Sequence, residues 1–180
     1  VNYSMNARNE VDTYDSLLFT RNMMNSFRNG VQHKIPVSLT LKVLKYFSLT
    51  NSVDFTERWY SMSINKQWIN DTLFSGNDTT VGYVRTDTIS GFKAVHEYGF
   101  SSSLNTNLYG MVQFKKGPVR ALRHVFRPSV SFSYRPDFGS SKFGYYRSVQ
   151  SDTAGNYRRY SIFGGEGTYT SVYGTPADGN

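Results

Sequence analysis

The three histidines are the first candidates for chemistry, because histidine is a common metal ligand and acid–base group. His33, His96 and His124 stand far apart in the sequence and match no metal-ligand spacing. Each falls on the apolar side of an alternating run described below. We therefore expect them to pack between strands or within an aromatic girdle, and not to bind a metal.

Other groups that resemble functional motifs each lack an essential part of the motif. Glu10, Asp12 and Asp15 are close enough to bind calcium in a loop, but they lack the glycine and the terminal Glu of an EF-hand. The GGEG stretch at 164–167 has no Lys-Ser/Thr and no following helix, so it is neither a P-loop nor a dinucleotide fingerprint. The chain contains no cysteine, which excludes disulfides and thiolate metal sites. The sequence predicts neither an enzyme nor a bound cofactor.

The composition favours strands. Phe, Trp and Tyr make up 16% of the 180 residues and charged residues 18%, against about 25% charged residues in typical globular proteins. No apolar run approaches the roughly 20 residues of a transmembrane helix, but a transmembrane barrel hides its apolar face in alternation. The net charge of +7 fits a solvated basic surface, nucleic acid, anionic lipid or an acidic glycan.

Five stretches alternate between apolar and polar residues, which is the period of a strand. The clearest are VQHKIPVSLTLKVLKY, FKAVHEYGFSSSLNTNLYGMVQF and RHVFRPSVSFSYRP. The predicted strands cover residues 1–9, 31–46, 47–64, 90–115 and 119–136. Between them, long loops over 10–30, 65–89 and 137–180 alternate with a tight turn near Leu44 to Phe47 and the short stretch KKGPVRA. In an antiparallel meander this order places every long loop at one end of the sheet, as in outer-membrane barrels.

The predicted strands are longer than the roughly five or six residues typical of soluble sheets. A half-buried soluble sheet explains any single strand, but five long strands with sorted loops favour a membrane barrel. We predict an all-β fold: an antiparallel transmembrane β-barrel segment, a meander of about five or six long strands. Residues 1–180 would form part of one outer-membrane barrel domain. The chain starts within a strand pattern and ends in turn-type residues, so we expect it to be an interior fragment.

The polar faces of these strands are mostly basic. If the apolar side faces lipid, the polar side lines a wet interior. The candidate contacts facing this lumen are Arg8, Lys42, Arg58, Lys93, Glu97, Arg123, Arg127 and Arg135. A basic lumen favours an anionic cargo, although pairing with acids outside this segment explains the same charges equally well.

Large aromatic residues stand toward the strand ends, where membrane barrels carry aromatic girdles. The girdle candidates are Phe47, Trp59, Tyr60, Phe92, Phe114 and Tyr134.

Pro128 lies within an alternating run, where it cannot donate a hydrogen bond to a neighbouring strand. The apolar phase continues unbroken from Phe126 to Tyr134. We therefore predict one missing ladder hydrogen bond at Pro128, without an inserted residue.

Several stretches of the chain resemble the barrel domain of LptD-like lipopolysaccharide-assembly proteins, most closely the branch found in Bacteroidota. They are LKYFSLTNSVDFTERWY (44–60), TDTISGFKAVHEYGFSSSLNTNLYG (86–110), ALRHVFRPSVSFSYRPDF (121–138) and GYYRSVQSD (144–152). The resemblance covers nearly the whole chain in the same order. One departure is Asn51, where the family pattern has proline.

The resemblance implies an outer-membrane β-barrel of a Gram-negative bacterium. Together with an LptE-like plug lipoprotein, such a barrel receives lipopolysaccharide from periplasmic lipid-bridge proteins and inserts it into the outer leaflet. It implies no catalytic residue, no cofactor and no nucleic-acid partner, because the family moves lipid without transforming it. The family's periplasmic domain and lateral gate are not recognisable in these residues.

Two alternatives remain open from the sequence. A porin or nutrient-transporter barrel predicts ion conductance by the full-length protein and lipopolysaccharide export that does not depend on it. A soluble glycan-binding β-sandwich predicts folding without detergent, and would leave five long apolar faces in water.

Overall fold

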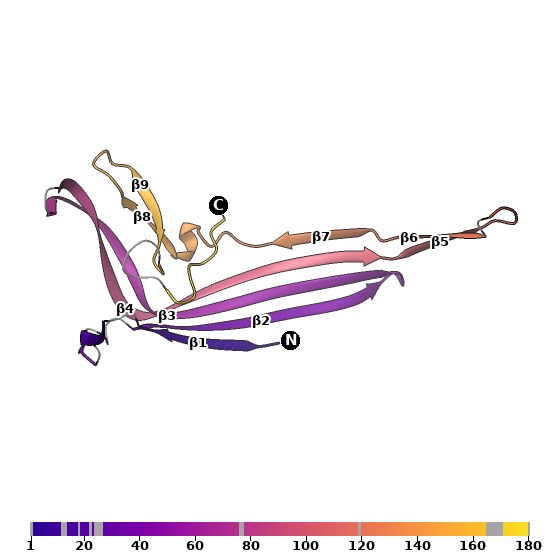
Figure 1. The fold of residues 1–180 in the computed structure, drawn as a ribbon, viewed down its shortest axis with the longest axis horizontal. Coiled ribbons are helices and arrows are strands. Elements are labelled where there is room, and N and C mark those ends of the chain that lie inside the picture. Colours follow the sequence, from indigo (N-terminus) through magenta and orange to yellow (C-terminus); the bar gives the residue numbers. More distant parts are fainter. Residues whose placement is uncertain are drawn as a thin grey trace. The chain divides into compact units, whose positions relative to one another are not determined.

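The computed structural model describes most of the chain as strand (Figure 1). It describes residues 2–11, 14–17, 19–21, 23, 27–75, 78–118, 120–164 and 171–179, with only the backbone of residues 17, 73, 75 and 78–80. The strands are β1 (Ser4–Glu10), β2 (Arg28–Val43), β3 (Phe47–Ser75), β4 (Asp78–Thr106), β5 (Leu108–Gln113), β6 (Ala121–Phe126), β7 (Ser129–Tyr134), β8 (Tyr146–Gln150) and β9 (Tyr157–Ser161). Two short 3-10 helices, η1 (Asp15–Leu17) and η2 (Ser141–Phe143), lie in the connections.

Five strands form one sheet in the order β1-β2-β3-β4-β7. The ladders β1–β2 and β4–β7 are antiparallel, as are the two-stranded ladders β5–β6 and β8–β9. The predicted all-β antiparallel meander is confirmed. Among the described residues, no helix has the length and apolarity needed to cross a membrane.

Two of the predicted long loops contain regular strands. Residues 65–89, predicted as a loop, mostly belong to β3 and β4, each of which is 29 residues long. Residues 137–180, also predicted as a loop, contain η2, β8 and β9. These parts were missed because a ladder of backbone hydrogen bonds needs no alternation of side chains.

The tight turn predicted near Leu44 to Phe47 is confirmed between β2 and β3. Leu44 and Lys45 both adopt positive φ angles, 49° and 66°. Tyr46 N donates to Leu44 O at 2.7 Å, so the turn closes around Lys45 with the i to i+2 hydrogen bond of a γ-turn. Neither residue is glycine or asparagine, so this turn is locally strained.

The chain divides into two compact units. The first unit contains Val1–Asn2, Ile35–Phe55 and Tyr98–Arg135, and the second contains Tyr3–Lys34, Thr56–Glu97 and Pro136–Asn180. The two units are described separately below.

In the first unit, the ladder between β4 and β7 separates polar from apolar side chains. Its polar pairs are Ser101–Ser133, Ser103–Ser131 and Asn105–Ser129, and its apolar pairs are Phe100–Tyr134 and Leu104–Val130. The apolar side includes one polar contact, in which Ser102 Oγ donates to Asn51 Oδ1 at 2.8 Å. Asn51, the residue that departs from the family pattern, therefore has a hydrogen-bond partner on the neighbouring strand.

The chain around Pro128 keeps its register although the strand is interrupted. Before the interruption Leu108 lies opposite Phe126, and after it Asn105 lies opposite Ser129. The two pairings belong to one continuous register, so no residue is inserted. Thr106 N donates to Pro128 O at 3.3 Å, whereas Pro128 has no N–H to donate in return. The single missing hydrogen bond predicted from the sequence is confirmed.

In the second unit, an irregularity in β4 changes which residues face the core. Val84 and Val95 pack against the same buried cluster, although one position is even and the other odd. Strict alternation would place them on opposite faces. Gly91 lies between them with φ 153°, a value that favours glycine. The alternation of β4 therefore reverses somewhere between Val84 and Val95.

Candidate functional site

One face of the second unit is covered by the chain that follows β7. The buried cluster joins side chains of β3 and β4 to side chains of β8, β9 and the residues after β9. Its members are Tyr60, Ile64, Val95, Val149, Tyr160, Ile162 and Phe163. The rings of Tyr60 and Phe163 stack with their centroids 4.7 Å apart. The β8–β9 hairpin is thus fixed on this face by apolar contacts.

Residues 171–179, which we call the strap, cross the same face over four strands. At β4, Ala177 N donates to Glu97 Oε1 at 2.8 Å. At β3, the Tyr60 hydroxyl donates to Gly174 O at 2.8 Å. These bonds join side chains of the sheet to the backbone of the strap.

The strap continues over β2 and β1. A Cβ atom placed on Gly30 of β2 would lie 2.5 Å from Val172 Cγ2, so the strap touches the backbone there. The Tyr173 hydroxyl donates to Asn6 O of β1 at 2.8 Å. The strap therefore packs against β4, β3, β2 and β1 in turn.

An ion pair lies beneath the strap. Arg58 Nη1 is 2.6 Å from Glu97 Oε2, and the two side chains are 15% and 3% exposed. Arg58 Nη1 also donates to Thr175 O at 3.4 Å. Because Glu97 binds both Arg58 and the Ala177 amide, this one carboxylate joins β3, β4 and the strap.

A second carboxylate holds the end of the strap. Asp137 Oδ1 accepts hydrogen bonds from the backbone amides of Gly179 and Gly139, both at 2.8 Å. These two bonds lower the pKa of Asp137 below its ordinary value, the Gly179 amide having the largest effect. Nearby, Arg159 pairs with Asp178 at 2.8 Å.

The opposite face of the second unit carries a row of aromatic rings across four neighbouring segments. Tyr3 stacks on His33 with centroids 6.0 Å apart, His33 packs on Trp59 at 4.4 Å, and Trp59 meets Phe92 edge-on at 5.8 Å. The Tyr3 hydroxyl and His33 Nδ1 are 2.7 Å apart. His33 thus packs between strands, as predicted for the histidines, and two girdle candidates, Trp59 and Phe92, lie side by side.

Tyr60 does not fit the predicted girdle. It is 1% exposed and lies under the strap, on the face opposite Trp59. Alternation along β3 explains the difference, because Tyr60 is two residues from Arg58 and therefore lies on the same side of the strand, opposite Trp59. The other girdle candidates belong to the first unit: Phe47 is half-buried, whereas Phe114 and Tyr134 are exposed.

The structure brings two of the eight lumen candidates into contact, namely Arg58 and Glu97. Arg8 instead pairs with its neighbour Glu10 at 2.5 Å. The guanidinium carbon of Arg123 lies 5.2 Å from the centre of the Tyr109 ring. The remaining candidates, Lys42, Lys93, Arg127 and Arg135, are exposed.

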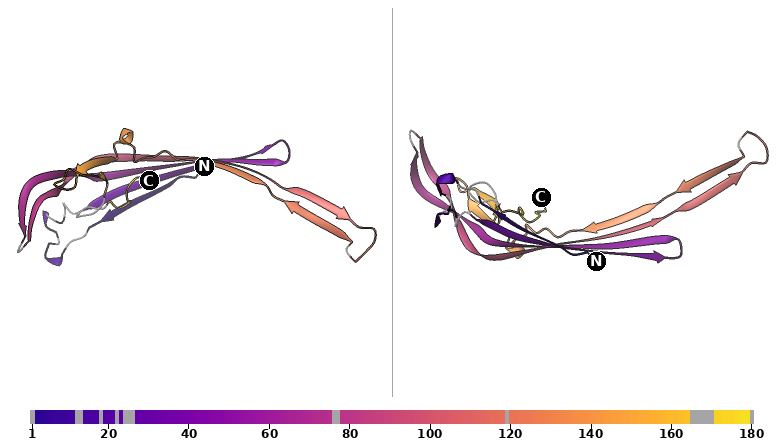
Figure 2. Two further views of the ribbon diagram at one scale, coloured as in Figure 1. Left: turned by 90° about the horizontal axis from the view of Figure 1, so that it is seen from above. Right: turned by 60° about the horizontal axis from the view of Figure 1, so that its bottom comes forward.

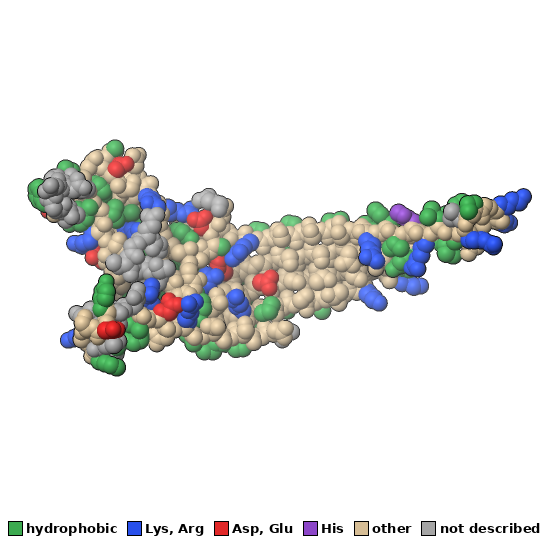
Figure 3. Space-filling view, in the orientation of Figure 1, with side chains coloured by type: hydrophobic (Ala, Val, Ile, Leu, Met, Phe, Trp, Pro, Cys, Tyr) green, Lys and Arg blue, Asp and Glu red, His purple; other side chains and the backbone are tan. Residues whose placement is uncertain are grey.

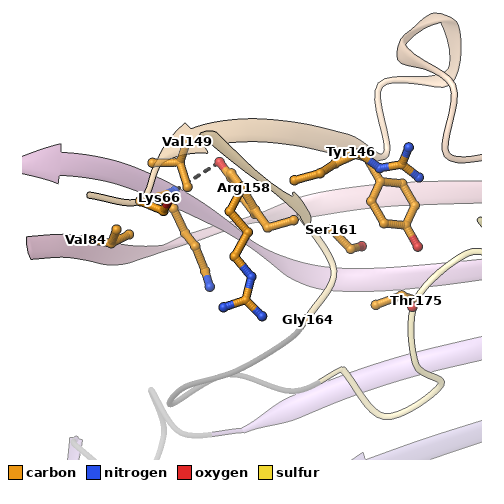
Figure 4. Close-up of a pocket in the computed structure, with 11 residues that line it drawn as sticks. Lys66, Val84, Tyr146, Val149, Arg158, Ser161, Gly164 and Thr175 are labelled. Carbon is orange, nitrogen blue, oxygen red and sulfur yellow. Dashed lines mark hydrogen bonds between the residues drawn. The ribbon is translucent and has the colours of Figure 1, made fainter. Parts of the chain in front are cut away.

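A cavity of about 410 Å³ opens between β3, β4 and the β8–β9 hairpin (Figure 4). Its described lining includes three cations, Lys66, Arg158 and Arg159, and no acidic side chain. Lys66 and Arg158 extend into it from β3 and β9 (Figure 4). The cavity suits an anionic group better than a cationic one. Among the described residues, no group of three or more His, Cys, Asp or Glu side chains could hold a metal ion.

The covering chain was missed in the sequence, although two signals for it exist. GYYRSVQS and YRRYSIF flank the turn-type residues DTAGN, which is typical of a hairpin. The even face of β3 changes from polar to apolar at Tyr60, Met62 and Ile64. Such a change indicates that something covers the face that is otherwise polar.

The comparison with protein families agrees with the resemblance noted in the sequence. The family described as LptD protein matches residues 1–180, the whole chain. Among curated proteins and among solved structures, no significant match was found. Proteins of the matching family transport and assemble lipopolysaccharide at the outer membrane of Gram-negative bacteria and are not enzymes. The chain belongs to the LptD family, and its all-β meander is a segment of that family's outer-membrane β-barrel.

Proposed function

We propose that this segment forms part of the wall of a barrel that translocates lipopolysaccharide and inserts it into the outer leaflet. Residues 1–180 then belong to one barrel domain, which works with an LptE-like plug lipoprotein and periplasmic lipid-bridge proteins. Membership of the family supports a role in lipopolysaccharide transport. It favours this function over a porin, a nutrient transporter or a soluble glycan-binding sandwich.

The main support for the proposal is the sheet of the first unit, which has one polar side and one apolar side. Hydroxyls line one side, where Thr40 Oγ1 lies 3.1 Å from Thr50 Oγ1. Exposed apolar residues such as Phe100 and Val130 occupy the other side of the β4–β7 ladder. A lipid amphiphile needs both environments, a wet path for its sugars and hydrocarbon for its acyl chains.

Exposed cations on the polar side supply the contacts to anionic groups. Lys42 is two residues from Thr40, and Arg127 is two residues from Ser129, so alternation places both cations on the hydroxyl side of the first unit. In the second unit, Lys93 is four residues from Glu97 and lies on the same side of β4. Arg and Lys form charge-assisted hydrogen bonds with phosphates and carboxylates. In the second unit, the cavity beside Lys66 and Arg158 offers the same chemistry.

Arg58 and Glu97 have a different role in this proposal. Their charges neutralise each other beneath the strap, so they hold the covering chain and do not bind cargo. The strap covers a polar face of four strands, and its position determines how much of that face the sugars can reach.

Adjacent positions on β7 test the path of the lipid in the full-length protein in cells. A photoreactive benzophenone side chain would replace Ser131 on the polar side or, as the matched control, Val130 on the apolar side. We expect lipopolysaccharide adducts at position 131 that require active transport, and lipid adducts at position 130 that do not. Equal adducts at both positions, or none at 131 during normal export, would contradict the proposed path.

The porin alternative has a separate readout. Purified full-length protein that conducts ions steadily, in cells whose lipopolysaccharide export does not depend on it, would support a diffusion channel and overturn the proposed function.

A further inference from the structure

The hairpin of β5 and β6 differs in charge from the rest of the chain. Between Tyr98 and Arg135 the sequence has six Lys or Arg residues and no Asp or Glu. Four of the six, Lys115, Lys116, Arg120 and Arg123, lie in the hairpin, and Arg127 and Arg135 follow it. This segment therefore accounts for nearly all of the net charge of +7.

The same hairpin lacks the polar face of the adjoining β4–β7 ladder. Leu108 pairs with Phe126 and Val112 with Leu122 on one face, and Tyr109 pairs with Val125 on the other. Together with Met111 these side chains are 37–63% exposed. Each face of the ribbon thus carries exposed apolar side chains, with Arg123 and Gln113 added on the face of Tyr109, whereas in the β4–β7 ladder serines and Asn105 occupy one face.

The hairpin also extends past its neighbour within the first unit. Thr106 Oγ1 donates to Tyr46 O at 2.7 Å, which places the end of β4 level with the β2–β3 turn. From Leu108 onward, β5 has only β6 as a hydrogen-bonded neighbour among the described strands. Six residue pairs at about 3.3 Å each extend the hairpin by roughly 20 Å. Figure 2 shows it continuing beyond the β2–β3 turn and diverging from it.

Cations and apolar side chains therefore gather on one projecting ribbon. On the face shown in Figure 3, blue and green side chains cover its end and no acidic side chain is visible there. A folded protein partner would cover one face of a two-stranded ribbon and leave the other apolar face in water. The interfacial region of a bilayer surrounds both faces, and its phosphates match the basic tip.

We propose that the β5–β6 hairpin is a membrane-surface anchor that binds anionic phospholipid headgroups. Tyr109, Met111 and Val125 on one face, and Leu108, Leu122 and Phe126 on the other, lie among the upper parts of the acyl chains. Lys115, Lys116 and Arg120 at the tip bind the phosphates by charge-assisted hydrogen bonds. Arg123, stacked on Tyr109, lies between these two regions.

Neighbouring positions on β5 test this anchor in the full-length protein, reconstituted in nanodiscs with or without phosphatidylglycerol. A benzophenone side chain would replace Met111 or Val112, which lie on opposite faces of the ribbon. We expect phospholipid adducts from both positions, with phosphatidylglycerol preferred over phosphatidylcholine. Adducts to protein from either position in cells would overturn the proposal and assign that face to a protein partner.

Charge neutralisation at the tip provides the second measurement. Each cation near an anionic surface contributes roughly fivefold to binding. Lys115→Gln, Lys116→Gln and Arg120→Gln together should therefore lower the preference for phosphatidylglycerol by up to about 100-fold, whereas Lys142→Gln, at an exposed position in η2, should not change it. Unchanged preference in the triple variant would overturn headgroup binding. Lipopolysaccharide adducts at Ser131 report on translocation separately, so the two proposals can fail independently.

Discussion

Replacing Glu97 should release the strap. Glu97 is 3% exposed and pairs with Arg58, which is 15% exposed, at 2.6 Å. Removing one partner of a buried ion pair destabilises a protein by about 3–5 kcal/mol. Arg58 keeps some solvent contact and the Thr175 carbonyl at 3.4 Å. We therefore expect Glu97→Leu to lower the free energy of strap opening by about 2–3 kcal/mol.

The chain offers a direct reporter of this opening. It contains no cysteine, and Ser171 at the start of the strap is buried. With Ser171→Cys in a full-length protein that has no other cysteine, a water-soluble thiol reagent reacts only when the strap opens. A decrease of about 2–3 kcal/mol in opening free energy increases the labelling rate by roughly 30- to 150-fold. Glu97→Gln keeps an acceptor for the Ala177 amide, so its effect should be smaller.

Two further variants distinguish the effect of losing the Arg58–Glu97 ion pair from nonspecific destabilisation of the fold. Asp87→Asn breaks the Arg85–Asp87 pair on β4, which is also short at 3.0 Å but 51% and 44% exposed. It should change labelling less than about fivefold, because exposed pairs contribute about 1 kcal/mol or less. Arg58→Met combined with Glu97→Leu leaves no uncompensated charge, so it should label more slowly than Glu97→Leu alone. Labelling of Glu97→Leu at the parent rate would refute the holding role of the pair.

Three other perturbations test particular parts of the fold. Lys45→Gly should stabilise the full-length protein by roughly 0.5–1 kcal/mol in denaturant unfolding, because φ 66° is unfavourable for lysine; a loss of stability would contradict the strained turn. Gly30→Ala should accelerate labelling at position 171 because the new Cβ would collide with Val172, whereas Gly110→Ala, with its nearest neighbouring atom 4.0 Å away, should not. The folded pKa of Asp137 is lowered, so its stabilising effect is complete above about pH 4 and is lost as pH falls through the folded pKa. Hydrogen exchange of the strap, corrected for its intrinsic pH dependence, should therefore rise in acid, and Asp137→Asn should remove that dependence.

The features predicted correctly from the sequence are those that depend on neighbouring residues in the chain. Period-two alternation identified the strands of the meander, and the unbroken phase after Phe126 predicted the register around Pro128. The β2–β3 turn was also local, since it had to lie between two alternating runs. In each case the side chains that determine the strand, the register or the turn are only a few residues away in the sequence.

The parts that were missed depend on contacts between residues far apart in the sequence. Tyr60 contacts Phe163 and Gly174, more than 100 residues later in the chain. No local pattern reports that a polar face will be covered by its own chain. The ends of β3 and β4 were missed for another reason, because Asn, Asp and Thr occupy much of 65–89 and strands there are held by backbone pairing.

The two parts of the covering chain differ in how much apolar surface they bury. The β8–β9 hairpin contributes Val149 and Tyr160 to an apolar cluster, so moving it would expose buried hydrocarbon to water. The strap also buries Pro176 and packs Tyr173 against this cluster. Its other attachments are hydrogen bonds that water can replace: Glu97 accepts from the Ala177 amide, the Tyr60 hydroxyl donates to Gly174 O, and the Tyr173 hydroxyl donates to Asn6 O. Opening of the strap therefore requires less free energy than displacement of the hairpin. If lipopolysaccharide needs the covered face, the strap is the element that moves first, and the charge on Glu97 determines how often it does.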